Sequence, residues 1–449
     1  MSRPTALSGF PEYLPAQRIV EQDVLGRIRR TFELNGFASI ETRSVEPLDQ
    51  LLRKGEIQNE VYVLRRLQAA EGDGDAGIGL HFDLTVPFAR YVLENAGHLD
   101  FPFRRYQIQR AWRGERPQEG RYREFVQADI DVVDRETLAP HYEVEIPLVV
   151  GEALRGLPIP PALVQVNNRK LAEGFYRGVG AEDPSAVLRS VDKLDKIGPD
   201  RVAALLVAEA GLSETAARAC LDLAGIRSFD ASFAEHVTAQ ATALGVSNPM
   251  LDEGLEELVR VIEATSAASP GLVMADLRVA RGLDYYTGTV YETLLQGHED
   301  LGSVCSGGRY DSLASDGKTT YPGVGMSIGV SRILGRVLGR KLAVASRSVP
   351  SAVLVAVADE EARGASNAVA ASLRARGIPC EVAPSAAKFG KQIRHAERRG
   401  IPYVWFPGTG EIKDIRSGDQ APADPSSWAP PAEDLWPTVE AAEPEEQNL

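Results

Sequence analysis

The stretch FRRYQIQRAWRGERPQEGRYREFVQADID, residues 103–131, decides the fold class of this 449-residue chain. It is rich in residues that favour strands, and a loop containing glycine interrupts it at residues 114–120. We therefore predict two antiparallel strands joined by a long loop. Gln127, Asp129 and Asp131 alternate with apolar residues along the second strand, so we expect all three on one face of the sheet.

Arginine is concentrated in the same stretch. Seven arginines stand there against three glutamates, although the whole chain has a net charge of −14. A planar guanidinium binds phosphate or carboxylate oxygens through paired hydrogen bonds. We therefore interpret the hairpin as an anion-binding site in an acidic protein. The alternative is a solvated strand face that is held by ion pairs.

Length and composition restrict the other possibilities. A chain of 449 residues predicts two to four domains. The sequence contains no apolar run near the length of a membrane helix, and its first residues lack the apolar region of a signal peptide. The three cysteines are far apart and suggest neither a disulfide framework nor a zinc site, so we expect a reduced, cytoplasmic chain. No phosphate-binding glycine loop of the P-loop or dinucleotide type is present.

The periodicity of apolar residues changes twice along the chain. Residues 168–270 have helical spacing and predict an all-α insertion. After about residue 345, strand and helix patterns alternate, which predicts a small α/β domain with a mostly parallel sheet. The tail from residue 437 is acidic, and we predict that it is disordered.

Two segments with strand character carry unusual polar residues. HFDLTVP, residues 81–87, is predicted as a strand up to its proline, with Asp83 and Thr85 on one face. Asp83 could hold a substrate ammonium, or it could cap a turn. RGLDYYTGTVYE, residues 281–292, also has strand character, so at most one of its adjacent tyrosines faces the same side as Arg281. Core-edge packing is the alternative for this segment.

Two further segments are rich in glycine, and a third is basic. CSGGRYD at 305–311 and YPGVGMSIGVSRI at 321–333 allow close approach of a ligand to the backbone, or simply tight turns. Arg332 has apolar neighbours, which favours a directed, semi-buried role. The helical segment at 387–400 has a surplus of positive charge and is a candidate RNA contact, although a solvated helix face would look the same.

Taken jointly, these segments resemble the histidine–tRNA ligase family, which are class II aminoacyl-tRNA synthetases. GFASIETRSVEP, from Gly36 to Pro47, resembles motif 1; WRGERPQEGRYREFVQADID resembles motif 2; and GVGMSIGVSRI resembles motif 3. RGLDYYTGTVYE and SGGRYD resemble the two histidine-specific segments of that family. The segment SVDKLDKIG at 190–198 also matches the layout of its helical insertion.

The resemblance implies an α/β (α+β) fold class. It implies an antiparallel class II catalytic core at residues 1–167 and 271–340, with the helical insertion at 168–270 between its parts. An anticodon-binding α/β domain would follow at 350–436, and the disordered acidic tail at 437–449.

The implied activity is ATP-dependent ligation of L-histidine to its tRNA through a histidyl-adenylate, with Mg²⁺ bound to ATP rather than to a protein motif. The implied catalytic residues are Arg113 and Arg281. The implied histidine-binding residues are Asp83, Leu84, Thr85, Arg113, Gln127, Asp131, Arg281, Tyr285, Tyr286 and Tyr310. Arg113, Glu115, Arg121 and Arg332 would bind ATP. The candidate tRNA-binding residues are Lys388, Lys391, Arg394, Arg398 and Arg399.

The resemblance also implies partners. They are L-histidine, histidine tRNA and a second copy of the chain in a homodimer formed through motif 1, with no membrane. Residue 114 is glycine where many bacterial members carry histidine, which affects how the acceptor stem would be read. The alternative function is a synthetase-like regulatory subunit of ATP phosphoribosyltransferase, a relative that generally lacks the C-terminal tRNA-binding domain. A pure RNA-binding module is a third possibility.

Overall fold

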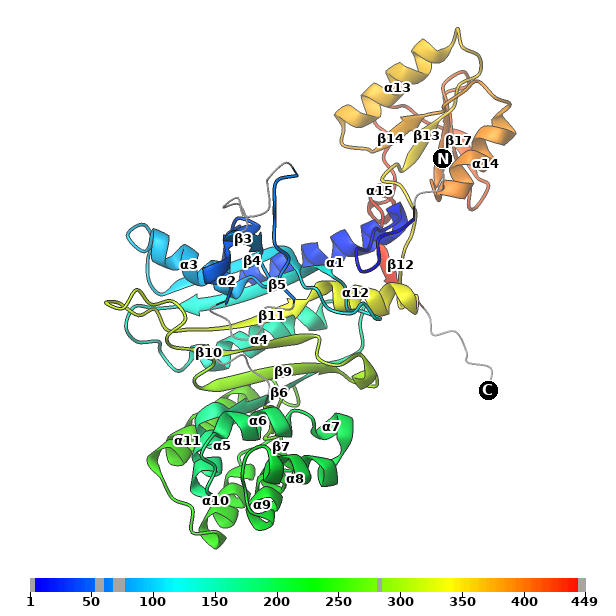
Figure 1. Cartoon of the computed structure of the whole chain (residues 1–449). Helices are drawn as coiled ribbons and strands as arrows, with labels where there is room; N and C mark the ends of the chain where they lie inside the picture. The colour runs from blue at the N-terminus through cyan, green and yellow to red at the C-terminus, as the bar shows by residue number, and fades with distance from the viewer. Residues whose placement is uncertain (1–4, 53–59, 68–76, 281–284, 443–449) are drawn as a thin grey trace, which may run out of the picture. The chain divides into compact units, whose positions relative to one another are not determined.

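The computed structural model describes residues 5–52, 60–67, 77–280 and 285–442. The chain forms two compact units, which Figure 1 shows as ribbons. The larger unit contains residues 1–11 and 25–336, and the smaller unit contains residues 12–24 and 337–449.

A nine-stranded sheet forms the centre of the larger unit. Its central strands are antiparallel, and only the pairs β1–β4 and β6–β8 are parallel. The strands follow one another across the sheet in the order β1 (Ala38–Ser39), β4 (Phe103–Trp112), β5 (Glu124–Val133), β11 (Gly323–Gly329), β10 (Cys305–Tyr310), β9 (Thr289–Leu295), β6 (Ala162–Asn168), β8 (Val273–Asp276) and β7 (Arg227–Ser228).

Strands β4 and β5 are the predicted hairpin. They pair antiparallel over their full lengths, so the prediction from residues 103–131 is confirmed. The register places Gln109, Gln107 and Arg105 on β4 opposite Gln127, Asp129 and Asp131 on β5, respectively. Partners in register share a face of the sheet, so two rows of polar side chains lie side by side.

Helices and a small ribbon surround this sheet. A two-stranded antiparallel ribbon pairs β2 with β3. Helix α1 is amphipathic, and Val20, Val24, Ile28 and Phe32 on its apolar face are buried. These elements are α1 (Pro15–Leu34), β2 (Val45–Pro47), α2 (Leu48–Leu51), β3 (Ile78–Leu80), α3 (Thr85–Asn95), α4 (Tyr142–Arg155), the short helix η3 (Glu299–Leu301) and α12 (Val330–Gly339).

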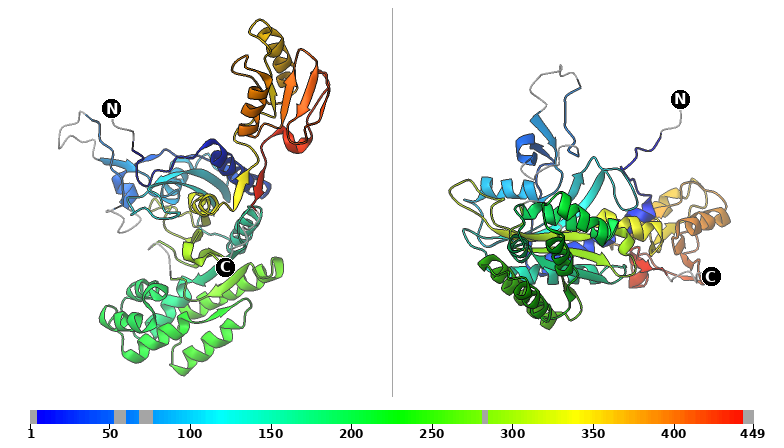
Figure 2. Two further views of the ribbon diagram at one scale, coloured as in Figure 1. Left: turned by 90° about the vertical axis from the view of Figure 1, so that its right-hand side faces the viewer. Right: turned by 60° about the horizontal axis from the view of Figure 1, so that its bottom comes forward.

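A group of helices follows β6, and the left view of Figure 2 shows them gathered together in green. They are α5 (Arg169–Gly178), α6 (Pro184–Val191), α7 (Leu194–Ile197), α8 (Pro199–Ala208), α9 (Glu214–Ala224), α10 (Phe233–Ala243) and α11 (Pro249–Ala268). The backbones of α5 and α11 nearly touch, because a Cβ on Gly254 would lie 2.1 Å from the Leu171 nitrogen. The segment also contributes strand β7 to the large sheet.

The smaller unit has a five-stranded sheet with the order β14-β13-β15-β16-β17. Strands β14, β13 and β15 pair in parallel as the sequence predicted, whereas β16 and β17 add two antiparallel pairs that the pattern did not predict. Helices α13 and α14 bring apolar residues to separate core clusters. The elements are β12 (Ala343–Ala345), β13 (Val353–Val355), α13 (Arg363–Ala375), β14 (Cys380–Val382), α14 (Phe389–Arg399), β15 (Tyr403–Phe406), β16 (Glu411–Asp414), β17 (Gln420–Pro422), α15 (Ala432–Leu435) and β18 (Val439–Ala441).

Three predictions of local structure were wrong. In the segment at 281–292, the described residues 285–288 are not a strand, and β9 begins at Thr289. The segment at 81–87 is not a strand, because α3 begins at Thr85 and accommodates Pro87 in its first turn, where no backbone donor is needed. The tail is ordered as far as Val439–Ala441, since β18 pairs with β12 through backbone bonds that composition does not reveal.

None of the described helices combines the length and apolar character that crossing a membrane requires.

Candidate active site

The polar face of β5 forms the floor of the site. Gln127 and Asp129 both contact Ser327 on the neighbouring strand β11, which confirms that they share a face. Gln127 Nε2 donates to Ser327 Oγ at 2.8 Å, and the Ser327 hydroxyl donates to Asp129 Oδ1. Asp131 lies two residues further along the same face. Three side chains that the pattern grouped are therefore together in space.

Glycines on β10 and β11 make room above this floor. A Cβ on Gly325 would lie 2.1 Å from Asp131 Oδ1, and one on Gly308 would lie 2.8 Å from the ring of Tyr286. Any side chain at these positions would fill the space that Asp131 and Tyr286 occupy. The glycines of the two segments therefore allow larger side chains to lie across the strands, which is more specific than a tight turn.

Asp131 and three tyrosines form a cup, which we call the phenol–carboxylate cup. The Tyr310 hydroxyl donates to Asp131 Oδ1 at 2.8 Å. The rings of Tyr285 and Tyr286 pack edge to face with centroids 4.7 Å apart, and Tyr285 also packs against Tyr310 at 6.2 Å. Because Tyr285 and Tyr286 precede β9, strand alternation does not constrain them, and both reach the same cup.

A buried arginine neutralises part of the cup. Arg105 is 0% exposed and places Nη2 2.6 Å from Asp131 Oδ2, while its guanidinium lies 4.2 Å from the ring centre of Phe88. Burial raises the pKa of Asp131 to about 6, and Arg105 and Tyr310 oppose that rise. Burial likewise raises the pKa of Asp129 to about 7. The positive charge of Arg105 opposes this rise, and the negative charge of Asp131 adds to it. The cup is therefore a place where carboxylates exchange protons near neutral pH.

Asp83 lies at the beginning of α3. Its Oδ1 accepts a hydrogen bond from the Val86 backbone N–H at 3.1 Å, so the capping alternative is correct for this oxygen. The negative charge of Asp83 also raises the pKa values of Asp129 and Asp131, which places it beside the cup. Leu84 is buried, and Thr85 is the first residue of the helix.

A cavity of about 290 Å³ adjoins this floor. Its lining brings together Arg113, Glu115 and Arg121 from the hairpin, Gln127 from β5 and Arg332 from α12. All four residues that the sequence assigned to ATP therefore meet in one place. The remaining lining residues include Phe125, Ser303, Ser306 and Ser327.

The arginines of this cavity are held in place by neighbours. Arg113 lies 4.3 Å from the ring centre of Phe82, and its Nε donates to the Phe82 carbonyl at 3.2 Å. Glu115 lies 3.8 Å from Arg113 and 3.6 Å from Arg121, so it links the two cations. Arg332 Nη1 donates to the Ser303 carbonyl. Such cations need little rearrangement when an anion arrives.

Part of the predicted anion-binding hairpin serves the fold instead. Arg104 pairs with Glu145 at 2.5 Å, Arg105 with Asp131, and Arg110 with Glu124 at 3.3 Å. For these strand arginines the ion-pair alternative was correct, because each has an acidic partner within reach. Sequence reasoning also missed Arg105 and Ser327 as members of the site. The hairpin register, which opposes Arg105 to Asp131, is the signal that could have found the first of them.

Two groups of predicted residues need separate mention. Arg281 lies outside the described residues, so its role stays a prediction. The basic residues at 388–399 lie on or next to α14 in the smaller unit. Lys388, Lys391, Arg394 and Arg398 are exposed, whereas Arg399 is half-buried and pairs with Glu381 at 2.6 Å.

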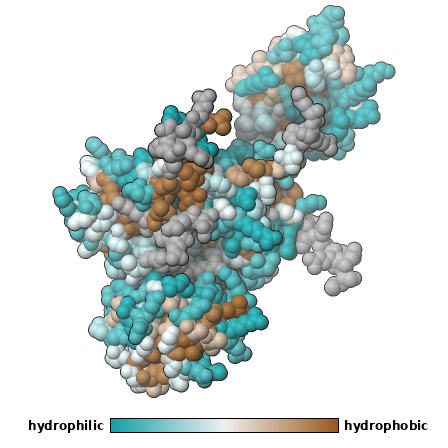
Figure 3. Space-filling model, viewed as in Figure 1, coloured by the Kyte–Doolittle hydropathy of each residue, from teal (hydrophilic) through white to brown (hydrophobic). Residues whose placement is uncertain are grey.

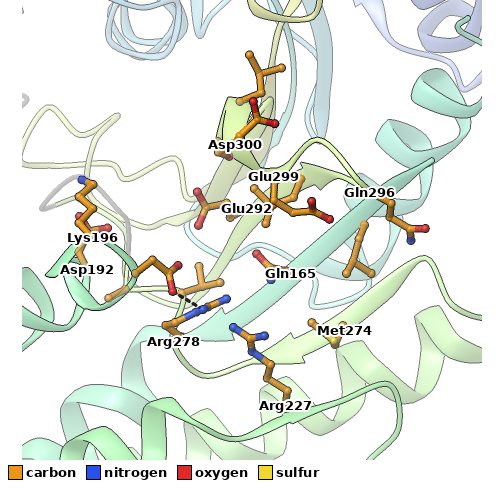
Figure 4. A pocket seen from close by; sticks show the side chains of 18 of the residues that line it. Gln165, Asp192, Lys196, Arg227, Met274, Arg278, Glu292, Gln296, Glu299 and Asp300 are labelled. Carbon is orange, nitrogen blue, oxygen red and sulfur yellow. Dashed lines mark hydrogen bonds and ion pairs between the residues drawn. The ribbon is translucent and has the colours of Figure 1, made fainter. Parts of the chain in front are cut away.

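A second, larger cavity of about 990 Å³ lies between the sheet and the helical segment (Figure 4). Arg278 pairs with Asp195 of α7 at 2.5 Å and with Asp276 of β8 at 3.2 Å, and Arg227 of β7 pairs with Asp276 at 3.0 Å. Gln165 of β6 also donates to Asp276, at 2.8 Å. This network links α7 to strands β6, β7 and β8 of the large sheet.

The chain matches two known protein families. The family model for histidyl-tRNA synthetase matches residues 9–333, and the model for an anticodon-binding domain matches residues 351–417. The histidine–tRNA ligase of Cutibacterium acnes is 61% identical over 454 aligned residues, covering 98% of this chain and 99% of that protein.

Solved structures agree with this match. The histidyl-tRNA synthetase of Nostoc sp. PCC 7120 has a TM-score of 0.82 at 32% identity, covering 94% of this chain and 97% of that one. A protein from Bacillus halodurans, described as an ATP phosphoribosyltransferase regulatory subunit/histidyl-tRNA synthetase, shares the fold with a TM-score of 0.71 at 18% identity, covering 87% of this chain and 96% of that one. The family model, the near full-length relative and the polar site on an antiparallel sheet all lead to one conclusion: this chain belongs to the histidine–tRNA ligase family of class II aminoacyl-tRNA synthetases.

Proposed function

We propose that this protein activates L-histidine with ATP and transfers the histidyl group to histidine tRNA, releasing pyrophosphate and AMP. The observation that carries the proposal is the meeting of Arg113, Glu115, Arg121 and Arg332 in one cavity, with Gln127 leading from it to the phenol–carboxylate cup. A nucleotide site and a cup for a small polar ring therefore adjoin each other. The domain organisation predicted from the sequence is part of the same proposal.

The cup suits an imidazole ring. Once water is excluded, a ring N–H needs an acceptor and the other ring nitrogen needs a donor. Asp131 supplies the first, and the hydroxyl of Tyr286 supplies the donor, because the Tyr310 hydroxyl already donates to Asp131. Asp83, Leu84 and Thr85 at the start of α3 would receive the α-ammonium, and Tyr285 would close the side of the cup by its contacts with the other two rings.

The cavity suits the phosphates of ATP. The first reaction is attack of the histidine carboxylate on the α-phosphorus, in which two anions approach and charge grows on the phosphoryl oxygens. Arg113 lines the cavity and packs against Phe82, which precedes Asp83, and its guanidinium would bridge the two anions. Arg121 and Glu115 would contact the γ-phosphate end and the adenine, and Arg332 would hold the nucleotide from the other side. Arg281 would add a further catalytic cation.

Mg²⁺ belongs to this proposal as a companion of ATP, whose charge it neutralises when bound. The described residues contain no cluster of three or more acidic, histidine or cysteine side chains that could hold a metal ion. Phosphate oxygens of the bound ATP would supply ligands to Mg²⁺, and water molecules would complete its coordination. The residues present fit a metal that arrives with its nucleotide.

A homodimer is also part of the proposal. Several large apolar side chains are exposed near the β2–β3 ribbon, in the region where Figure 3 shows apolar residues gathered over α2 and β3. They are Leu52 at 40% exposure, Val63 at 53%, Leu67 at 99% and Ile78 at 41%. Such a group normally marks an interface. Sedimentation of an active protein as a monomer would contradict this part.

The smaller unit would bind the anticodon part of the tRNA through the exposed basic residues at 388–398. We also propose a cytoplasmic location, because the cysteines Cys220, Cys305 and Cys380 are all free and buried. The regulatory-subunit alternative is less supported, since the near full-length relative is a ligase and the chain carries an anticodon-binding domain.

Histidine-dependent exchange of labelled pyrophosphate into ATP tests the first step, and charging of histidine tRNA tests the second. Arg113→Met should lower the exchange rate by about 100-fold, as expected for removal of one positioned donor at the reacting centre. Arg110→Met is the matched control, because Arg110 lies on the same hairpin but pairs with Glu124. A chain that binds histidine without exchange would favour the regulatory function.

A further inference from the structure

Three side chains on the floor of the site form a continuous hydrogen-bonded chain. Asp129 on β5 is 1% exposed, and its Oδ1 accepts from the hydroxyl of Ser327 on β11. The oxygen of that hydroxyl accepts from Gln127 Nε2 at 2.8 Å. The chain therefore runs from a buried carboxylate to an amide that borders the nucleotide cavity.

The direction of each bond follows from chemistry. An ionised carboxylate can only accept, so Ser327 must give its one hydroxyl proton to Asp129. The Ser327 oxygen is then left with lone pairs alone, and Gln127 can bond to it only through its NH₂ group. The carbonyl oxygen of Gln127 must consequently point the other way. An ionised Asp129 thus directs the NH₂ group of Gln127 toward Ser327 and leaves the Gln127 carbonyl oxygen available to a ligand.

The carbonyl oxygen of Gln127 has no hydrogen-bond partner within the described part of the chain. Gln127 is 8% exposed, and its Oε1 is buried without a hydrogen bond. A buried carbonyl oxygen left unpaired costs about 1–3 kcal/mol, so this atom is suited to a donor that a ligand brings. Gln127 lines the cavity, and Asp131 of the cup lies further along the same face of β5. With the ring of histidine in the cup, the α-ammonium that Asp83 would receive would also face Gln127.

We propose that Asp129 is a positioning residue for histidine: acting through the Ser327 hydroxyl, it holds the Gln127 amide with its carbonyl oxygen toward the substrate ammonium. This inference rests on the proposed placement of histidine in the cup. In this inference Asp129 and Ser327 orient the Gln127 amide, and neither residue contacts the substrate directly. If Asp129 takes up a proton, it can donate to Ser327, and the amide can then turn its NH₂ group toward the ammonium.

The surroundings of Asp129 make that protonation accessible near neutral pH. The charged and titratable groups facing it are Arg105 on β4, Asp131 on β5, Cys305 on β10, Tyr286 before β9 and Asp83 before α3. Burial raises the pKa of Asp129 to about 7, and of the charged neighbours in the described part of the chain only Arg105 opposes the rise. The amide orientation suited to histidine is therefore complete above this pKa and is lost as the pH falls through it.

Histidine affinity, measured by isothermal titration calorimetry without ATP, tests the relay independently of catalysis. We expect Asp129→Asn to weaken histidine binding about tenfold at pH 8, the size of one hydrogen bond to a charged group. Ser327→Ala should weaken it similarly, and the double variant should show no further loss because both changes break one chain. Additive losses would overturn the inference.

Two further measurements separate the relay from a general distortion of the cup. Imidazolepropionate lacks the ammonium, so its affinity should be the same in Asp129→Asn and wild type; an equal loss for both ligands would refute the relay. The ratio of variant to wild-type affinity should also approach one as the pH is lowered toward 6, while a pH-independent ratio would contradict the direction argued from Asp129.

Ser190→Ala is the matched control. Ser190 is fully buried and donates to the Ala186 carbonyl at 3.0 Å within α6, far along the chain from the relay. Its variant should bind histidine normally. If the wild type binds histidine but does not exchange pyrophosphate, the proposed ligase activity is refuted and the relay can still be tested by binding. If the wild type does not bind histidine, both the ligase activity and the relay are refuted.

Discussion

Replacing Arg105 by Met tests the electrostatics of the phenol–carboxylate cup most directly. Arg105 is 0% exposed and contacts Asp131 at 2.6 Å, and its charge lowers the pKa values of both Asp129 and Asp131. Methionine keeps much of the volume against Phe88 but removes the charge. Breaking a buried ion pair in this way costs about 3–5 kcal/mol of unfolding free energy, because the remaining carboxylate is left uncompensated.

The loss should depend on pH in a defined direction. In the wild type the folded pKa of Asp131 is about 6, above its usual value of 3.8, so the carboxyl destabilises the fold increasingly as the pH rises through the folded value. Without Arg105 the folded pKa values of Asp131 and Asp129 rise further. The extra destabilisation should therefore be small near about pH 5.5, where both acids are largely protonated in either folded protein, and largest near about pH 8.

Urea-induced unfolding followed by circular dichroism at the two pH values measures the effect, with a shift of the midpoint at constant slope as the signature. Arg104→Met is the matched control on the same strand. Arg104 is 24% exposed and pairs with the 31% exposed Glu145, so its loss should cost about 1 kcal/mol or less at both pH values. An Arg105→Met variant as stable as the wild type at pH 8, or a loss equal at both pH values, would refute the reasoning.

Three further changes have clear expected outcomes. Gly325→Ala places a methyl 2.1 Å from Asp131 Oδ1, so the affinity for histidine measured by calorimetry should fall at least about tenfold. Gly335→Ala brings a methyl within 2.9 Å of the Gly120 backbone in the hairpin loop, so steady-state exchange should show a raised KM for ATP with little change for histidine. Asn168 caps α5 by accepting from the Lys170 and Leu171 backbone N–H groups, and Asn168→Ala should cost about 1 kcal/mol in urea unfolding with exchange activity retained.

Local patterns in the sequence predicted the parts of the site that depend on one element at a time. The alternation of Gln127, Asp129 and Asp131 gave the correct shared face, because side chains two residues apart on a strand point to the same side. The pairing of β5 with β4 fixes its register in the sheet. The loop residues Arg113 and Arg121 were assigned to an anion site, and they line one cavity. Strand geometry alone gave the shared face, and the chemistry of guanidinium gave an anion site on the hairpin as a whole, whereas the family resemblance singled out Arg113 and Arg121.

Predictions that depended on neighbouring elements were less successful. Arg105 counted as a free cation until the sheet placed Asp131 opposite it, and a list of arginines does not distinguish a paired residue from an available one. Tyr285 and Tyr286 were assigned to opposite faces of a strand, but they precede β9 and pack on one another. In both cases tertiary contacts decided the outcome, and a single sequence does not display them.

The charges around the cup imply that histidine binding is coupled to proton release. Asp83, Asp129 and Asp131 interact with one another, and among the described residues only the charge of Arg105 offsets Asp129 and Asp131, so the empty cup keeps part of its negative charge neutral by protonation. With a pKa of about 7 for Asp129, roughly half of the molecules carry that proton at neutral pH. The substrate ammonium supplies a second positive charge and lowers this pKa, so binding should release up to about half a proton at pH 7 and almost none at about pH 8.5. Calorimetric titrations in buffers of different ionisation enthalpy measure this number, and Asp129→Asn should reduce it to the small contribution of the ligand's own imidazole. Proton uptake on binding would contradict this coupling, and the same release from Asp129→Asn would show that the proton comes from a group other than Asp129.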